Sequence, residues 1–302
     1  MTKKTTDDAV ENLRSAQDRG LHACYDERPD APSDVWNHRD YGSWKTSIWG
    51  LIEDFATPEV VESFLAAPPE DIVSDDPSWL EEIVHRVRNE AFDMKSLLAN
   101  RLRERYSAIR AVHGTRTDDV ERFYGEGLKP LQPEKFHRQA RLLFLQGKFP
   151  ELNESSLQAA IHQVGSDLRE GRVYFEANEE MLLTYCGHYM IYGSEYLTSL
   201  AAQIGSKRDY RQVLTTYGKP TVLVCDVPLE LISDYTLEEF SGWSLEALFQ
   251  ELLEGSDFQI NPSRGAGFCI RSRLDPHCIV GHYHPESIRD PLTGIIHRWR
   301  IS

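Results

Sequence analysis

Residues 109–130, with the sequence IRAVHGTRTDDVERFYGEGLKP, constrain the fold more than any other part of the chain. The apolar residues before His113 predict a short buried strand, and Gly114 predicts a tight turn that exposes the histidine at the strand's end. Because glycine has no Cβ, a ligand could approach the backbone closely there. The turn would therefore present an imidazole, the Thr115 hydroxyl and bare backbone at one place.

A short helix is expected directly after this turn. Asp118 and Glu121 have the spacing of a capping box, which satisfies the free backbone N–H groups at a helix start. Gly127 and then Pro130 would end the helix, because glycine suits the position after a helix and proline cannot continue one.

These residues resemble the first strand and following helix of the ADP-ribosyltransferase superfamily, in its His-Tyr-Glu branch. That branch includes poly(ADP-ribose) polymerases, diphtheria-like toxins and RNA 2′-phosphotransferases. Its pattern is His-Gly-Thr or His-Gly-Ser, a gap, then Gly-Leu and often a proline, which here reads His113-Gly114-Thr115, Gly127-Leu128 and Pro130. The resemblance implies that NAD⁺ is bound as a substrate. His113 would bind the nicotinamide-side ribose, the Gly114 backbone would pair with the carboxamide, and Thr115 would support the adenosine-side ribose.

The composition is that of a globular protein, with 302 residues, 40% hydrophobic and 27% charged. The net charge of −15 argues against broad nonspecific binding to nucleic acids and against contact with anionic membranes. The five cysteines are scattered, which indicates reduced thiols and a cytoplasmic location. No apolar run approaches the length of a membrane span, and the first residues contain no apolar signal core, so no membrane partner is expected.

Two regions are predicted along the chain. Residues 1–105 are expected to be all-helical, with a helix over 6–19 and a long one over 79–106, and a protein partner could bind through this region. Residues 106–302 are expected to be α+β, with short antiparallel strands. The resemblance gives this second region the split antiparallel β-sandwich with helices of the ADP-ribosyltransferases. Further helices are predicted over 133–170, 194–204 and 244–254, and further strands over 173–175, 221–225, 268–270, 278–280 and 295–299.

The family's second site residue is a tyrosine that stacks on nicotinamide, and the sequence offers two candidates. Tyr174, in Gly-Arg-Val-Tyr-Phe, resembles the polymerase strand, and Tyr185 then stands where polymerases carry a second stacking tyrosine. Tyr189, in a Gly-His-Tyr strand that leads into a helix, resembles the toxin pattern and is favoured.

The residues after Tyr189 support that preference. Tyr192, Ser194 and Glu195 lie just before a predicted helix, whose N-terminal N–H groups favour phosphate. Tyr192 and Ser194 are therefore expected to contact NAD⁺, and Glu195 to take part in catalysis. A helix cap formed by Ser194 and Glu195 is the alternative interpretation.

The third family residue is a glutamate on the last core strand, which stabilises the cationic ribose as nicotinamide leaves. Here His277 occupies that position in LDPHCIVGHYH and is expected to be the third catalytic residue. The family relies on this glutamate for chain elongation, so the product should carry a single ADP-ribose. Glu195 or Glu286 would supply the missing charge.

The sequence therefore predicts a cytoplasmic NAD-dependent mono-ADP-ribosyltransferase, with a toxin or defence role by analogy. The acceptor is an unidentified protein, nucleic acid or small molecule. One alternative is an RNA 2′-phosphotransferase, whose phosphate site would use Arg116, Arg264, Arg271 and Arg273. Another is an inactive module that binds NAD⁺ or ADP-ribose. A zinc site at His277, Cys278, His282 and His284 was weighed as well, but no metal ion is expected because the spacing supplies no complete ligand set.

Overall fold

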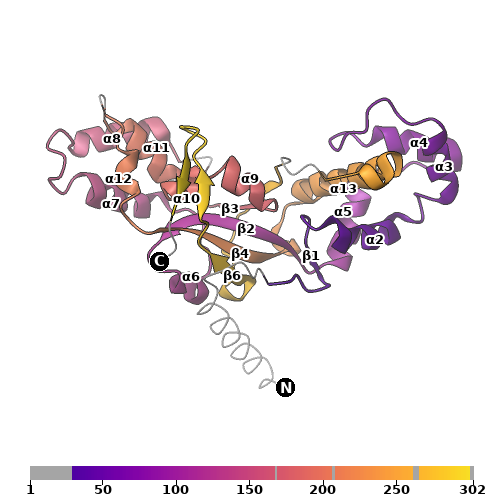
Figure 1. Ribbon diagram of the computed structural model, residues 1–302, viewed down its shortest axis with the longest axis horizontal. Coiled ribbons are helices and arrows are strands. Elements are labelled where there is room, and N and C mark those ends of the chain that lie inside the picture. Colours follow the sequence, from indigo (N-terminus) through magenta and orange to yellow (C-terminus); the bar gives the residue numbers. More distant parts are fainter. Residues whose placement is uncertain (1–28, 167–168, 206–207, 261–264, 300–302) are drawn as a thin grey trace, which may run out of the picture. The chain divides into compact units, whose positions relative to one another are not determined.

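The computed structural model describes residues 29–166, 169–205, 208–260 and 265–299, so the helix expected over residues 6–19 lies outside the described part. The chain divides into two compact units that alternate along the sequence. The helical unit comprises Ala31–Arg110 and Val227–Phe268, and the mixed unit comprises Ala111–Asp226 together with the residues from Cys269 onward. Helices precede and accompany a sheet with antiparallel pairs, which confirms the α+β class (Figure 1).

In the helical unit, one long helix from late in the chain packs with helices from its beginning. The long helix is α13 (Asp234–Glu254), and the early elements are β1 (Val35–Trp36), α2 (Tyr41–Ile52), α3 (Pro58–Ala66), α4 (Ser78–Arg88) and α5 (Met94–Arg105). The helix predicted over 244–254 is therefore ten residues too short at its start, and the α13 N-cap is Ser233, whose side chain accepts from the Thr236 N–H. The sequence around Ser241 and Ser244 looks polar, but both hydroxyls donate to carbonyls one turn earlier in the helix.

The single long helix predicted over 79–106 is wrong, because the chain forms α4 and α5 with a break between them. Asn89 ends α4 in the left-handed conformation, with φ of 55°. Asp93 then starts α5 by accepting a hydrogen bond from the Ser96 N–H at 3.0 Å. Asparagine and aspartate are common at such ends, because their short side chains can bond to nearby backbone.

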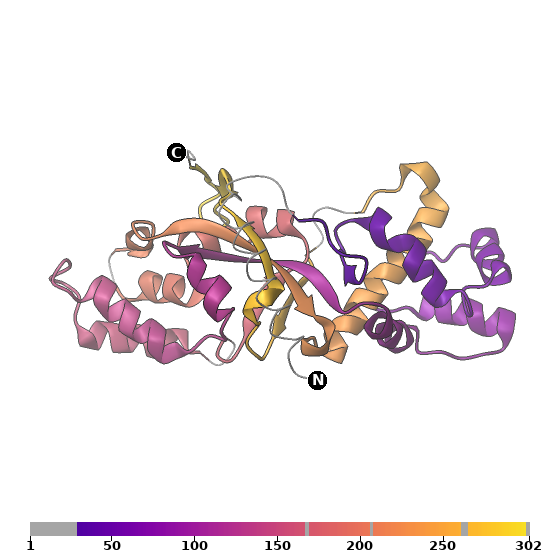
Figure 2. The same cartoon turned by 90° about the horizontal axis from the view of Figure 1, so that it is seen from below.

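A five-strand path, β5-β3-β2-β4-β6, forms the main sheet, and β1 pairs parallel to β2 outside this path. The strands are β2 (Ala108–Thr117), β3 (Val173–Glu176), β4 (Lys219–Pro228), β5 (Gly267–Ile270) and β6 (Ile279–Tyr283). β2 and β4 lie side by side, as Figures 1 and 2 show. β3 runs antiparallel to β2 with Val112 opposite Glu176, and β6 runs antiparallel to β4. The strands predicted at 173–175, 221–225 and 268–270 are confirmed.

The tight turn predicted at Gly114 is wrong, because β2 continues through His113, Gly114 and Thr115 to Thr117. The predicted capping box is absent as well. Helix α6 (Glu121–Glu126) begins after Val120 without a side-chain cap. The Asp118 carboxylate instead accepts a hydrogen bond from the Gly218 N–H at 3.1 Å. Gly127 does end the helix, with φ of 66°.

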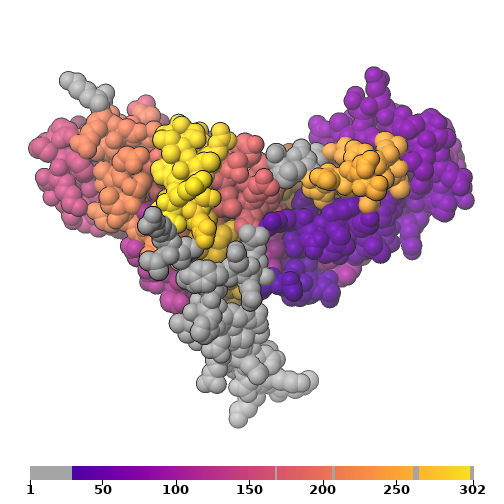
Figure 3. Space-filling view, viewed as in Figure 1, coloured from indigo at the N-terminus to yellow at the C-terminus, as the bar shows by residue number. Residues whose placement is uncertain are grey.

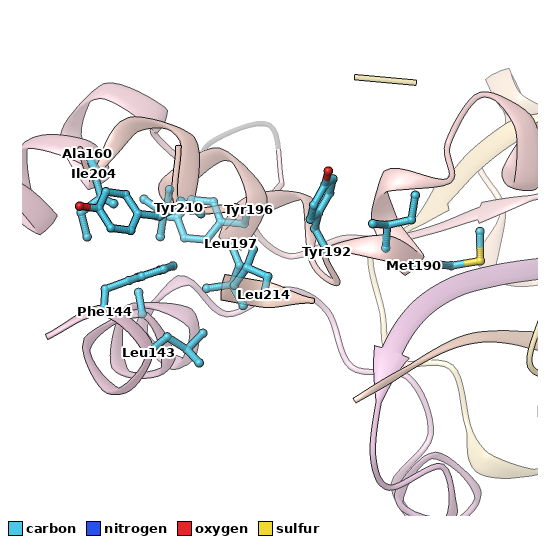
Figure 4. Packing of buried hydrophobic residues seen from close by; sticks show 14 of the residues in the cluster. Leu143, Phe144, Ala160, Met190, Tyr192, Tyr196, Leu197, Ile204, Tyr210 and Leu214 are labelled. Carbon is cyan, nitrogen blue, oxygen red and sulfur yellow. The ribbon is translucent and has the colours of Figure 1, made fainter. Parts of the chain in front are cut away.

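Helices of the mixed unit flank its part of the sheet. They are α7 (Pro133–Phe144), α8 (Glu154–Val164), α9 (Glu179–Thr184), α10 (His188–Ile191), α11 (Glu195–Gln203) and α12 (Arg211–Leu214), followed by a hairpin of β7 (Ser287–Arg289) and β8 (Ile296–Arg298). The helix predicted over 133–170 is thus split into α7 and α8. Phe144 from α7 and Tyr196 from α11 meet Tyr210 in the core of this unit (Figure 4).

Gly242 of α13 gives a test of close packing in the helical unit. A Cβ at Gly242 would lie 2.0 Å from the Ser74 carbonyl oxygen, whereas a Cβ at Gly50 of α2 would meet nothing within 4 Å. We expect Gly242→Ala to lower the free energy of unfolding by about 1–3 kcal/mol, because backbone must move. Gly50→Ala, the matched control, should raise it by up to about 1 kcal/mol, because alanine is the better helix former. Urea unfolding of both variants measures this, and equal effects would contradict the close packing.

Candidate functional site

His113 on β2 is joined to the neighbouring strand β3. Its Nδ1 lies 2.8 Å from the carbonyl oxygen of Tyr174, and its ring lies 5.9 Å from that of Phe175. Because a carbonyl only accepts, Nδ1 carries the proton and Nε2 remains an acceptor. Burial lowers the pKa of His113, and the bond to Tyr174 only partly opposes this. A neutral imidazole is therefore fixed in one tautomer, able to accept a hydrogen bond from a ligand hydroxyl.

Gly114 has a packing role that the sequence did not reveal. A Cβ at this position would lie 3.0 Å from Leu182 Cδ1 and 3.1 Å from Met190 Cγ. The missing side chain thus lets α9 and α10 approach the strand next to His113. Thr115 follows on the same strand and is partly exposed.

Two of the tyrosines considered for nicotinamide present their rings to solvent. Tyr174 on β3 is 47% exposed, and Tyr185, just after α9, is 46% exposed. Tyr189 is more enclosed: its ring centroid lies 4.1 Å from that of His188, and burial raises its pKa to about 12. The Gly-His-Tyr strand expected around Tyr189 is wrong, since these residues form the short helix α10. Of the two patterns considered, only the one at Tyr174 lies on a strand.

Tyr192 and Ser194, which were also predicted to contact NAD⁺, form hydrogen bonds with other residues of the protein. Tyr192 is 2% exposed, and its hydroxyl donates to Asp290 at 2.8 Å. Ser194 caps α11 by accepting a hydrogen bond from the Tyr196 N–H at 3.2 Å, as the alternative interpretation predicted. As placed, Tyr192 belongs to the core of the mixed unit and Ser194 to a helix start.

Glu195 is bound to an arginine. Arg169 donates to it through Nε and, at 2.7 Å, through Nη2, and the Ser199 hydroxyl donates at 3.0 Å. Burial alone would raise the pKa of Glu195, but the hydrogen bonds and charge of Arg169 outweigh this and lower it. Within the described residues, no hydrogen bond or ion pair joins Glu195 to His113.

His277 does not lie on the last core strand. It is exposed in the 3₁₀ turn η3 (Pro276–Cys278), which precedes β6. The turn forms because the Cys278 N–H donates to the Asp275 carbonyl at 3.0 Å, so the strand predicted over 278–280 begins only at Ile279. Glu286, the other carboxylate proposed to supply charge, is also exposed.

The buried carboxylates of β3 and α9 were missed by the sequence analysis. Glu176 is 8% exposed on β3, opposite Val112, and it accepts a hydrogen bond from the Asn178 N–H at 3.0 Å. Its charge also raises the pKa of Cys186, after burial as the larger cause, so it lies close to the Tyr185–Cys186 segment. Glu179 is 4% exposed on α9 and accepts a hydrogen bond from the Tyr283 hydroxyl. The signal for Glu176 was its place directly after the strand predicted over 173–175.

The histidines considered for zinc have protein partners. His282 Nδ1 lies 2.8 Å from the Tyr124 hydroxyl, and burial, with a smaller contribution from His284, lowers the His282 pKa to about 4. His284 Nδ1 lies 2.9 Å from the Pro220 carbonyl oxygen. In the described part of the chain, no group of three or more His, Cys, Asp or Glu residues is placed to hold a metal ion.

Arg116 was expected to bind a phosphate, but its guanidinium donates hydrogen bonds to backbone carbonyl oxygens. It donates to the carbonyl oxygens of Met190 at 3.3 Å, of Thr215 at 2.6 Å and of Tyr217. Burial lowers its pKa, which the charge of Asp118 only partly offsets. The other arginines of that predicted cluster do not add to it, because Arg271 and Arg273 are exposed and Arg264 lies outside the described residues.

Loss of the Arg116 side chain should destabilise the protein. We expect Arg116→Met to lower the free energy of unfolding by about 2–4 kcal/mol, because three carbonyl oxygens lose a charged donor. Arg122→Met is the control, since the Arg122 side chain is 58% exposed and its one hydrogen bond within the described residues goes to Glu126 at 3.2 Å. It should change stability by no more than about 0.5 kcal/mol. Chemical denaturation distinguishes the two, and an unaffected Arg116→Met would show that these contacts contribute nothing.

Comparison of the chain with protein-family models, with curated proteins and with solved structures gives no match. No helix among the described residues has the length and apolar character needed to cross a membrane. A function for this protein therefore has to be inferred from the chemistry and geometry of its own residues.

Proposed function

We propose that this protein is an NAD⁺-dependent mono-ADP-ribosyltransferase with the fold of that superfamily. One observation carries the proposal: His113 of the His-Gly-Thr motif lies on β2 and bonds to Tyr174 of the antiparallel neighbour β3 at 2.8 Å. Two motifs that resemble the same family, and that lie 61 residues apart, thus meet on adjacent strands. The rings of Tyr174 and Tyr185 are 47% and 46% exposed.

In this proposal the protein positions NAD⁺ and stabilises charge. His113 accepts a hydrogen bond from the nicotinamide-side ribose through Nε2, and the Gly114 backbone pairs with the carboxamide. Thr115 supports the other ribose. Tyr174 and Tyr185 flank the nicotinamide, in the polymerase-like arrangement, and Tyr189 backs them from α10. The bond between C1′ and nicotinamide breaks, nicotinamide leaves as a neutral molecule, and an acceptor oxygen or nitrogen bonds to C1′ and loses its proton.

The cationic ribose needs a nearby negative charge, and Glu176 is the carboxylate best suited to supply it. It lies on β3 opposite Val112, and because side chains alternate along a strand it shares a sheet face with Tyr174 rather than with His113. Glu195 was the earlier candidate, but Arg169 already neutralises its charge. His277 and Glu286 are exposed and are given no part in this step.

An inactive module that binds NAD⁺ or ADP-ribose is the second candidate function. The exposed His277 favours it, because the family's elongating glutamate has no counterpart at that position. The phosphotransferase alternative is weakened, since Arg116 is committed to three backbone carbonyls. Turnover of NAD⁺ separates the transferase from the inactive module.

Binding of NAD⁺ should require His113. We expect millimolar NAD⁺ to raise the melting temperature of the wild-type protein, because a ligand that binds only the folded state stabilises it. His113→Ala should abolish most of this rise. His162→Ala, which changes an exposed histidine on α8 in the same unit, should retain it. Differential scanning fluorimetry gives the answer, and a wild-type protein that does not respond would refute the assignment.

The transfer product should carry one ADP-ribose per modified site, and its formation should depend on Glu176. Labelled NAD⁺ is incubated with the protein and cell extract, and mass spectrometry counts the units on the acceptor. Glu176→Gln should slow NAD⁺ consumption at least about tenfold, a loss of about 1.4 kcal/mol in transition-state stabilisation. Tyr174→Ala should act similarly. Glu286→Gln, an exposed carboxylate, is the control and should leave the rate unchanged. Ladders of repeating units would contradict the proposal, as would a fully active Glu176→Gln variant.

A further inference from the structure

A cavity of about 400 Å³ lies within the mixed unit and plays no part in the proposed transfer. Residues of α8, α10, α11 and α12 line it, and Leu292 in the turn of the β7–β8 hairpin contributes to its wall. The hairpin is the yellow segment on the face shown in Figure 3. A volume of this size suits a small metabolite. Among the described lining residues, Glu195 alone belongs to the residues predicted for NAD⁺.

Two arginines in the cavity wall are held in fixed orientations with donors to spare. Arg169 uses Nε and Nη2 for Glu195, and Arg211 uses Nε and Nη2 for Asp209, the latter at 2.8 and 2.6 Å. The Nη1 groups of both have no hydrogen-bond partner among the described residues. Since each guanidinium is already braced by a carboxylate, a ligand would meet preorganised N–H donors.

His188 adds an unsatisfied polar atom to the same wall. Its Nδ1 is buried and has no hydrogen-bond partner in the described part of the structure. Buried polar atoms without partners are uncommon, and they mark places where a ligand or water completes the bonding. Burial is the largest influence on the His188 pKa and lowers it, while Glu195 and Asp290 oppose this and Arg211 adds to it.

The polar groups around the cavity are mainly donors. The Arg169 and Arg211 guanidiniums point to an acceptor-rich ligand, as do the amides of Gln163 and Gln203, which also line the cavity. The main acceptor, Glu195, is already satisfied by Arg169 and Ser199. We propose that this cavity binds a phosphate monoester of a small metabolite, with the phosphate oxygens on Arg169 and Arg211 and the organic part toward His188 and Leu292.

The described lining of the cavity does not include His113, although the cavity adjoins the proposed NAD⁺ site, because the His188 ring lies 4.1 Å from that of Tyr189. His188 lines the cavity, whereas Met190 of the same helix α10 packs where Gly114 lacks a side chain. Substitution at His113 should therefore leave phosphate-ester binding intact. This separates the failure of one proposal from the failure of the other.

The test is isothermal titration calorimetry of the full chain with ribose 5-phosphate, with ribose and inorganic phosphate as comparison ligands. We expect ribose 5-phosphate to bind more tightly than either comparison ligand. Arg211→Gln should weaken binding at least about tenfold, because a charged donor is lost. Asp209→Asn is the matched control: it removes the carboxylate that braces Arg211 but keeps the Arg211 charge, so it should weaken binding less than Arg211→Gln does. His113→Ala should bind as the wild type does.

Three results would overturn the proposal. One is the absence of heat from ribose 5-phosphate at millimolar concentration with the folded wild-type protein. Another is equal weakening by Arg211→Gln and Asp209→Asn, which would mean that the pair has a structural role only. The third is loss of binding in His113→Ala, which would place the ligand at the NAD⁺ site. Thermal unfolding of each variant confirms that it is folded, and Arg211→Lys, which keeps the charge, should weaken binding less than Arg211→Gln.

Discussion

The guanidinium of Arg116 connects β2 to two other segments of backbone through three carbonyl oxygens. Its partners are the carbonyl oxygens of Met190, Thr215 and Tyr217, and they lie on α10 and in the loop that leads into β4. A partly buried cation without a salt bridge is normally costly, and here three hydrogen bonds compensate for the lost water. Through the Met190 carbonyl, Arg116 thus links α10 to β2 two residues after Gly114.

Tyrosine hydroxyls donate hydrogen bonds to several carboxylates of this protein. The pairs are Tyr192–Asp290, Tyr283–Glu179, Tyr210–Glu151 and Tyr41–Glu251, the last of which also receives Lys45. A neutral hydroxyl can donate to a carboxylate without adding charge, which suits a chain whose net charge is −15. In two of these pairs the acceptor is almost completely buried, with Asp290 at 0% and Glu179 at 4% exposure.

Local sequence patterns were enough to predict the strands that contain a continuous run of apolar residues. The apolar run of β4 and the Val173–Phe175 stretch of β3 are examples, and the α+β class followed from them. The errors arose where distant residues decide the conformation. Gly114 suggested a turn, but Leu182 and Met190 fill the space beside it and the strand continues. The start of α13 was missed because Ser241 and Ser244 make that part of the sequence look polar. In the structure their hydroxyls donate to carbonyl oxygens of the same helix.

In the candidate site, too, local motifs were recognised from the sequence, whereas contacts between distant residues were not. His113 and Tyr174 were both identified from short motifs, yet only strand pairing shows that they touch. The partnership of Glu195 with Arg169 spans 26 residues and left no periodic signal. His277 was placed at the family's glutamate position on the last core strand by resemblance, but Pro276 and the Asp275 carbonyl shape a 3₁₀ turn there.

The alternation of the two units along the chain has a consequence for synthesis on the ribosome. The helical unit begins with Ala31–Arg110 but needs Val227–Phe268, including α13, to complete it. All of Ala111–Asp226 must therefore be translated before the first helices find their long partner. Until then the faces of α2 and α5 that contact α13 stay uncovered in the nascent chain, and those are the surfaces that a chaperone would shield. A fragment that stops near residue 105 would keep this exposed state permanently.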